Sequence, residues 1–189
     1  MHPQFPVLPG SRRILRIGAR RWFGIIALST SVGACVPSGQ LAQHQAAVPA
    51  FDPVTFFAGA TEGRGSLKIL TKHRQPVMVR GQGVVTPDGG IVLDQDVRRD
   101  GAAPTHRIWH LRRVAPDRYA GTLTDATGPV TGEVSGNRLH LRFATRGGLR
   151  ADQWLYLQPG GQIARNRMVI RKFGIAIASL DETITRVAP

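Results

Sequence analysis

The single cysteine of this chain, Cys35, is the residue with the most distinctive potential chemistry. One cysteine cannot form an internal disulfide, and it cannot supply the thiolates of a cysteine-based zinc site. A lone cysteine either packs as a small apolar side chain or serves as the target of a modification. The residues that precede it favour the second interpretation.

The 34 residues before Cys35 have the layout of an export signal. They contain five arginines and no acidic residue, with a basic stretch ending at Arg20-Arg21-Trp22-Phe23, then a short apolar run over 24–28 and small residues up to Ala34. The apolar run is far shorter than the roughly 20 residues of a membrane-spanning helix. We therefore expect residues 1–34 to be a signal peptide that is removed.

Val32-Gly33-Ala34-Cys35 resembles the lipobox of bacterial lipoproteins, where an aliphatic and two small residues precede an acylated cysteine. The resemblance implies a thioether-linked diacylglyceryl group on Cys35, and two or three chains such as palmitate hold a protein firmly on a membrane. Val36-Pro37 after the cysteine favours the outer membrane, facing the periplasm, over the inner membrane. Export through the Sec route and the twin-arginine route both remain open.

The charge of the chain is strongly basic but unevenly distributed. The formal net charge is +13, and without residues 1–34 it falls to +8, from 20 basic and 12 acidic residues. In an envelope compartment the available polyanions are lipid headgroups, so we expect a membrane surface rather than a nucleic acid as partner. Residues 36–50 are polar and aperiodic, and together with Cys35 they form a lipidated, flexible tether over 35–50.

Residues 51–189 alternate between apolar and polar positions in short runs separated by turn residues, which predicts an all-β domain. Asp88-Gly89-Gly90 and Gly136-Asn137 are typical hairpin turns. We expect an antiparallel, lipocalin-like barrel of about 8–10 strands, with a two-sheet sandwich as the alternative and a helical turn over 53–58 capping one end. The expected strands are 66–72, 77–85, 91–98, 105–114, 118–125, 130–135, 138–145, 153–158, 163–171 and 175–187.

Four aromatic residues are candidates for filling the barrel or lining a ligand cavity: Trp109, Tyr119, Trp154 and Tyr156. A structural ion pair is expected for Glu62, with Arg107 or Arg167 as its partner. His106 and His110 are too far apart on one strand to share a metal ion. We therefore expect no metal, no cofactor and no catalytic constellation.

Several motifs within 51–187 together resemble a bacterial family of lipoproteins that is known only as a domain of unknown function. The motifs are Phe56 to Gly65 (FFAGATEGRG), Arg107-Ile108-Trp109 with Leu111, Tyr119-Ala120-Gly121, Gly132, Gly136-Asn137, Asp152 to Leu157, Asn166-Arg167-Met168 and Lys172-Phe173-Gly174. The resemblance implies an envelope location and a single domain, and it implies no reaction or ligand. Gln153 departs from the second acidic residue that family members tend to have there.

Two functions remain open from the sequence. The domain is either a binding module for a lipophilic or anionic ligand, or an assembly factor of the envelope without a ligand cavity. A binding module needs a cavity of some 300 Å³, whereas an assembly factor needs an exposed contact surface. An enzyme is a distant third possibility, because the sequence contains no recognisable nucleophile elbow or phosphate-binding loop.

Overall fold

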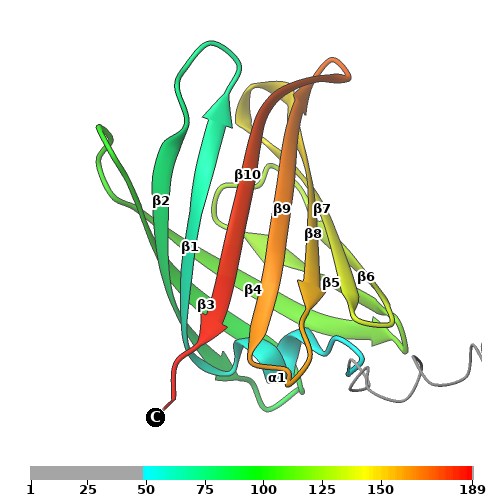
Figure 1. Cartoon of the computed structure of the whole chain (residues 1–189). Helices are drawn as coiled ribbons and strands as arrows, with labels where there is room; N and C mark the ends of the chain where they lie inside the picture. Colours follow the sequence, from blue (N-terminus) through cyan, green and yellow to red (C-terminus); the bar gives the residue numbers. More distant parts are fainter. Residues whose placement is uncertain (1–48, 189) are drawn as a thin grey trace, which may run out of the picture. The chain divides into compact units, whose positions relative to one another are not determined.

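The computed structural model describes residues 49–188, so the expected signal peptide, Cys35 and nearly all of the tether lie outside it. The described chain is all-β apart from two short helical segments (Figure 1). Its elements are α1 (Pro53–Phe57), β1 (Gly59–Ile69), β2 (Gln75–Val85), β3 (Ile91–Arg99), β4 (Thr105–Ala115), β5 (Arg118–Leu123), β6 (Val130–Ser135), β7 (Arg138–Thr145), η1 (Arg146–Gly148), β8 (Leu149–Leu157), β9 (Ile163–Lys172) and β10 (Ile175–Arg186).

The ten strands form a closed antiparallel barrel in which each strand pairs with the next one along the chain. The barrel closes where β1 pairs with β10, from Thr61 opposite Arg186 to Ile69 opposite Ala178. A sandwich would leave these two strands unpaired, so the expected barrel is confirmed and the sandwich is excluded. Closure also removes the free edges that would otherwise pair with another chain.

Side-chain alternation gives the barrel an apolar interior and a wet outer face. On β4, Trp109 and Leu111 point inward and are 6% and 8% exposed, while His110 between them is exposed. The hairpins reverse at residues with positive φ, including Gly89 and Gly136, as expected for such turns. The first strand begins at Gly59 instead of residue 66, because the glycine-rich segment lies within the barrel wall and is not a loop.

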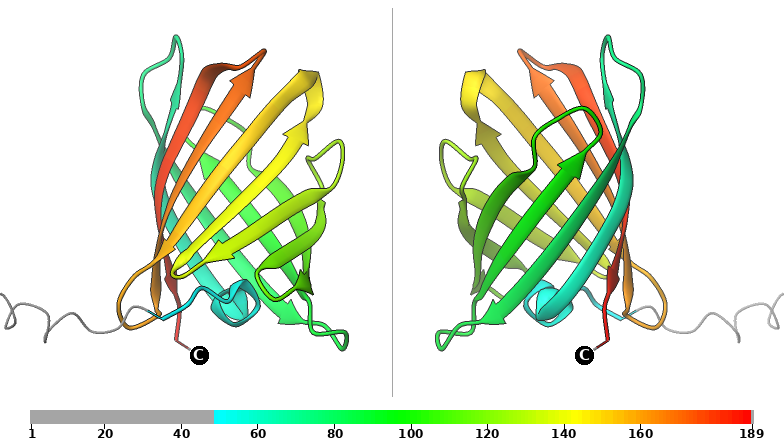
Figure 2. Two further views of the ribbon diagram at one scale, coloured as in Figure 1. Left: turned by 90° about the vertical axis from the view of Figure 1, so that its right-hand side faces the viewer. Right: turned by 90° about the vertical axis from the view of Figure 1, so that its left-hand side faces the viewer.

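Helix α1 closes one end of the barrel (Figure 2). Asp52 caps it, accepting a hydrogen bond from the Val54 amide at 3.1 Å, and Pro53 occupies the first turn, where its missing N–H is not needed. Phe56 and Phe57 are buried and belong to the main core cluster, whose other members include Phe51 and Leu139. The helix is therefore a hydrophobic plug, in the place where a short cap was expected.

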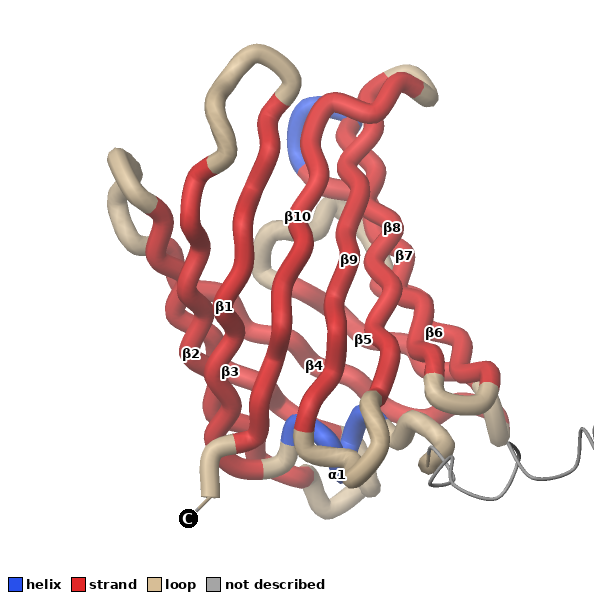
Figure 3. The backbone as a smooth tube through the Cα atoms, in the orientation of Figure 1, coloured by secondary structure: helices blue, strands red, loops and turns tan. Residues whose placement is uncertain are grey.

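The opposite end of the barrel carries a second, smaller apolar cluster and no helical plug (Figure 3). This cluster consists of Leu67, Val77, Val79, Val97 and Leu180. We call this end the mouth. Neither helical segment of residues 49–188 has the length and apolarity that a membrane-crossing helix needs.

Candidate functional site

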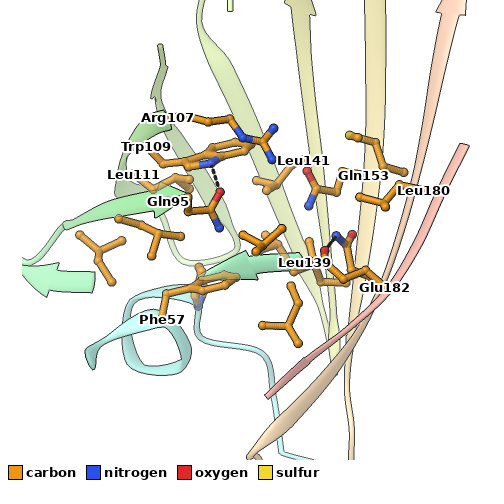
Figure 4. A pocket seen from close by; sticks show the side chains of 18 residues that line it. Phe57, Gln95, Arg107, Trp109, Leu111, Leu139, Leu141, Gln153, Leu180 and Glu182 are labelled. Carbon is orange, nitrogen blue, oxygen red and sulfur yellow. Dashed lines mark hydrogen bonds between the residues drawn. The ribbon is translucent and has the colours of Figure 1, made fainter. Parts of the chain in front are cut away.

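A cavity lies inside the barrel between α1 and the mouth (Figure 4). Its volume is about 50 Å³, which is room for a few water molecules or a small part of a ligand. Leucine, isoleucine, valine and aromatic side chains form most of its wall. Five polar side chains interrupt this wall: Gln95, Arg107, Gln153, Asn166 and Glu182.

Glu182 and Asn166 form a buried polar pair on neighbouring strands β10 and β9. Their exposures are 8% and 4%, and Asn166 Nδ2 donates a hydrogen bond to Glu182 Oε2 at 2.7 Å. Glu182 Oε1 and Asn166 Oδ1 are buried without a hydrogen-bond partner among the described residues. Burial raises the pKa of Glu182, while the Asn166 hydrogen bond and the Arg107 charge oppose the rise.

Two glycines of β1 make room for Glu182. A Cβ atom at position 63 would overlap the Glu182 carboxylate, and one at position 65 would overlap the backbone of β10. Glycine weakens a strand unless it allows such a close approach. The glycine-rich segment of β1 therefore positions the one acidic side chain that faces the cavity.

Arg107 and Trp109 approach the cavity from β4 (Figure 4). Trp109 Nε1 donates a hydrogen bond to Gln95 Oε1 at 2.9 Å, which fixes both side chains. Arg107 Nε is buried without a hydrogen-bond partner in the described part of the chain. Burial lowers the pKa of Arg107, an effect that Asp125 and Glu182 oppose, and its guanidinium remains charged at neutral pH.

A second hollow of about 230 Å³ lies at the mouth and shares Arg107, Met168 and Leu180 with the inner cavity. Arg99, Thr105 and Asp125 contribute polar groups to it, and Leu67, Val77, Val97 and Ile170 supply apolar wall. Polar and charged groups therefore line the mouth. The interior behind them is mainly apolar, with Glu182 as an acidic side chain in its wall. This arrangement suits an amphiphilic ligand.

Of the four aromatic candidates for the cavity, Trp109 lines it. Tyr119 is 2% exposed and belongs to the core near α1, where its hydroxyl donates to Asp52 Oδ1 at 3.3 Å. Trp154 and Tyr156 point outward, since Leu155 and Leu157 occupy the inward positions of β8. Their assignment to the cavity was wrong because the run from Trp154 to Leu157 is apolar at every position and fits either orientation.

The ion pair expected for Glu62 is also corrected by the structure. Glu62 Oε1 lies 3.0 Å from Arg64 NH2, and both side chains are on the outer face of β1. Arg107 points into the barrel and Arg167 lies on the outer face of β9, so neither is the partner of Glu62. The acidic residue near Arg107 inside the barrel is Glu182, which the sequence reasoning did not single out.

The outer face carries two histidine–aspartate contacts. His106 Nδ1 lies 3.4 Å from Asp94 and 3.2 Å from Asp96, and His140 Nε2 lies 3.1 Å from Asp152. Within residues 49–188, no group of three or more histidine, cysteine or acidic side chains is arranged to hold a metal ion. His140 also stacks on Trp154, with ring centroids 4.8 Å apart.

Comparisons with known proteins give a family and a fold. Residues 29–186 match the family described as "Protein of unknown function (DUF3833)". Among curated proteins, none has a significantly matching sequence. Three of the solved structures with a similar barrel, all at low sequence identity to this chain, support the calycin-like fold alone.

The first of these structures is the S-type phycobiliprotein lyase CPES from Guillardia theta (TM-score 0.59, 7% identity), with 72% of this chain and 91% of that chain covered. The second is a DUF3598 protein of unknown function from Nostoc punctiforme (TM-score 0.56, 10% identity), with 75% of this chain and 51% of that chain covered. The third is Rv2717c from M. tuberculosis (TM-score 0.56, 17% identity), with 73% of this chain and 99% of that chain covered.

Proposed function

The chain belongs to the DUF3833 family of proteins of unknown function, and we propose that it is an exported, lipid-anchored binding module for a small amphiphilic ligand. The proposal places the anchor on Cys35 and the ligand in the barrel, entering through the mouth. It assigns no catalytic step to the protein.

One observation carries the binding role: Arg107, Asn166 and Glu182 each have a buried polar atom without a partner beside the cavity. An unpartnered buried polar atom costs about 1 to 3 kcal/mol. A barrel that only needed a filled core would be more stable with apolar side chains at these positions. A ligand with an anionic head would satisfy Arg107 and remove part of this cost, and a hydrogen-bond donor on the same ligand would in addition satisfy Glu182 and Asn166.

The charges and the cavity volume define the ligand class. Arg99 and Arg107 at the mouth suit a carboxylate or phosphate head, since guanidinium groups bind such heads through two parallel hydrogen bonds. The apolar wall suits a short hydrocarbon segment, stabilised at about 25 cal/mol per Å² of buried apolar area. The inner volume of about 50 Å³ limits the enclosed part to a few heavy atoms. Longer chains require movement of flexible side chains such as Met168.

The positions of Trp109 and Trp154 allow a direct test. We propose to titrate the unacylated mature chain, residues 35–189 carrying Cys35→Ser, with alkyl carboxylates and with alcohols of equal chain length while following tryptophan fluorescence. Carboxylates should give a saturable change that persists in Trp154→Phe and disappears in Trp109→Phe. Arg107→Gln should weaken the binding of carboxylates and leave that of alcohols nearly unchanged.

The absence of any saturable response would contradict the binding role and favour the second candidate, an envelope assembly factor. That candidate has its own structural support. Trp154 stacks on His140 at the outer surface, Tyr156 is 40% exposed beside it, and aromatic residues of this kind are enriched at protein contacts. A response that is equal in Trp109→Phe and Trp154→Phe would likewise place the ligand outside the cavity.

A further inference from the structure

Three hairpin ends on neighbouring strands lie at the mouth, and we call them the rim: residues 68–74, 146–150 and 171–176 (Figures 1 and 3). Strand pairing holds them side by side. The Leu70 amide donates to the Ile177 carbonyl at 2.9 Å, which joins the first hairpin to the third. Leu149 pairs with Lys172, which joins the second to the third.

Large apolar side chains stand exposed on two hairpins of the rim. Phe173 is 90% exposed, Ile175 is 66% exposed and Leu70 is 64% exposed. Phe173 also has a φ of 50°, a backbone conformation that a bulky side chain seldom adopts and that favours glycine or asparagine. The fold therefore holds an aromatic side chain at the tip of a hairpin, where it is exposed to solvent.

The rim is strongly cationic. It contains Lys68, Lys72, Arg74, Arg146, Arg150, Arg171 and Lys172, and the three segments contain no acidic residue. Arg171 contacts Asp152 at 2.8 Å, and Arg74 lies 3.5 Å from Asp181, so two of the seven have an acidic partner elsewhere on the barrel. Lys172 Nζ lies 5.7 Å from the centroid of the Phe173 ring, so a cation lies next to the exposed aromatic side chain.

From this combination we infer that the rim docks on the surface of an anionic phospholipid bilayer. Exposed apolar tips enter the boundary between headgroups and acyl chains, while cations around them contact the headgroups. Each Lys or Arg close to an anionic membrane contributes about 1 kcal/mol, or roughly a fivefold gain in partitioning. The apolar groups stand on two projecting hairpins, Phe173 and Ile175 on one and Leu70 on the other, and they line neither the inner cavity nor the hollow at the mouth, which suits insertion into a bilayer better than capture of a peptide.

The rim lies at the opposite end of the barrel from the point where the described chain begins (Figure 2). At that point the Phe51 amide donates to the Gly136 carbonyl at 2.8 Å, in the hairpin turn between β6 and β7. Cys35 precedes Pro49 by 14 positions, which span at most roughly 50 Å when extended. A barrel of 11-residue strands, tilted by about 40°, is roughly 28 Å tall. A chain anchored at Cys35 is thus long enough for the rim to meet the same membrane.

Vesicle binding tests this inference independently of any ligand in the cavity. The unacylated mature chain, residues 35–189 carrying Cys35→Ser, is mixed with vesicles of equal parts phosphatidylglycerol and phosphatidylcholine, or of phosphatidylcholine alone, and bound protein is separated by flotation. We expect binding to the anionic vesicles that falls as salt is raised. Adding Lys72→Gln and Lys172→Gln together should lower the partition coefficient roughly 25-fold, about fivefold for each cation.

Two matched variants at the α1 end serve as controls: Val84→Ser, at a residue 62% exposed, and Arg118→Gln, at an exposed arginine. These should bind like the parent chain, whereas Phe173→Ser should bind more weakly. Equal losses at the two ends would overturn the inference and indicate attraction by net charge alone. Unchanged binding in the rim variants would overturn it too, and would indicate that residues outside the rim bind the vesicles.

The orientation is checked by introducing a tryptophan at the rim. Phe173→Trp should add fluorescence that shifts to shorter wavelength on anionic vesicles and is quenched by lipids brominated in their acyl chains. Val84→Trp should show neither effect. In both variants the fluorescence of the native tryptophans, measured on the parent chain, is subtracted. Quenching at position 84 but not at 173 would reverse the proposed orientation and refute docking through the rim.

Discussion

Gly63 of β1 lies directly against the carboxylate of Glu182 on β10, so that a Cβ atom at position 63 would overlap Glu182 Oε1. The same Cβ would approach Val79 Cβ to 3.3 Å, which is a tight contact but not an overlap. The absence of a side chain at one position of the wall thus makes it possible to bury an acid at another. The buried acid in turn gives the cavity its polar spot.

This relationship predicts that Gly63→Ala destabilises the barrel through its effect on Glu182. Overpacking of this kind costs about 1 to 3 kcal/mol. The cost should be smaller in a Glu182→Ala background, where the carboxylate is absent, and a double-mutant cycle from urea unfolding measures the difference. Gly128→Ala is the control, because a Cβ there meets no atom within 4 Å. Equal costs of Gly63→Ala in both backgrounds would show that the glycine serves another purpose.

Glu182 also predicts a pH dependence of stability. Burial raises its pKa above the ordinary value of 4.5, so the folded protein holds this proton to higher pH than the unfolded chain does. The contribution of Glu182 to stability is therefore present below about pH 4.5 and is lost as pH rises through the folded pKa. Glu182→Gln removes this loss and retains an acceptor for Asn166. Its stability relative to wild type should increase from acidic to neutral pH.

Urea unfolding of both proteins across that pH range checks the expectation. Glu133→Gln is a suitable control, since Glu133 is exposed on the outer face and lies 3.8 Å from Arg142. Glu133 is not buried, so the control should not show this increase. A constant difference between Glu182→Gln and wild type at all pH values would mean that Glu182 has the same pKa in the folded and the unfolded chain, and that burial does not raise it.

The strands, the barrel and the orientation of β4 could be predicted from the sequence, because alternation in that strand is clean. Ile108, His110 and Arg112 alternate with Trp109 and Leu111, so only one face can be buried. β8 gave no such information around Trp154, where apolar residues occupy both faces. The packing of Leu155 and Leu157 decided the orientation, and packing across the barrel cannot be read from one strand.

The polar part of the site carried a signal that could have been used. Glu182 lies between Leu180 and Ile184 at a spacing of two, so strand periodicity alone places it inward. Asn166 lies in the same way between Ala164 and Met168. What the sequence could not show is the register in which β1 meets β10, which places Gly65 opposite Glu182. The fit between Gly63 and the Glu182 carboxylate follows from that register.

Asp52 should control how firmly α1 closes the barrel. Its carboxylate accepts hydrogen bonds from the Val54 amide, the Thr55 hydroxyl and the Tyr119 hydroxyl. Asp52→Ala should lower the free energy of unfolding by about 1 to 2 kcal/mol, whereas Asp52→Asn, which can still cap the helix, should lose less. Asp117→Ala, in an exposed turn, should have little effect. Equal losses for Asn and Ala at position 52 would mean that charge, not capping, is what matters.

Tyr119 provides a spectroscopic readout of the same contact. Burial and the nearby Asp52 carboxylate raise the pKa of Tyr119 to about 12, while Arg113 opposes the rise. Removing the carboxylate in Asp52→Ala should lower the pKa of Tyr119, because the phenolate would no longer face a negative charge. Absorbance of tyrosinate as a function of pH measures the change. An unaltered titration would show that Asp52 has little electrostatic effect on the phenol.

The proposed acylation of Cys35 predicts that Cys35→Ser abolishes labelling by a palmitate analogue in cells. Serine cannot form the thioether on which the anchor depends, so the signal peptide should also remain uncleaved by the lipoprotein route and the mass should change accordingly.

Membrane association by itself is not a sufficient readout, because the rim offers a second route to the bilayer. High salt separates the two routes, since it weakens the contact of exposed cations with headgroups but not the insertion of acyl chains. We therefore expect the wild-type protein to stay on membranes at high salt and the Cys35→Ser protein to be released. Labelling that persists in Cys35→Ser would refute the anchor.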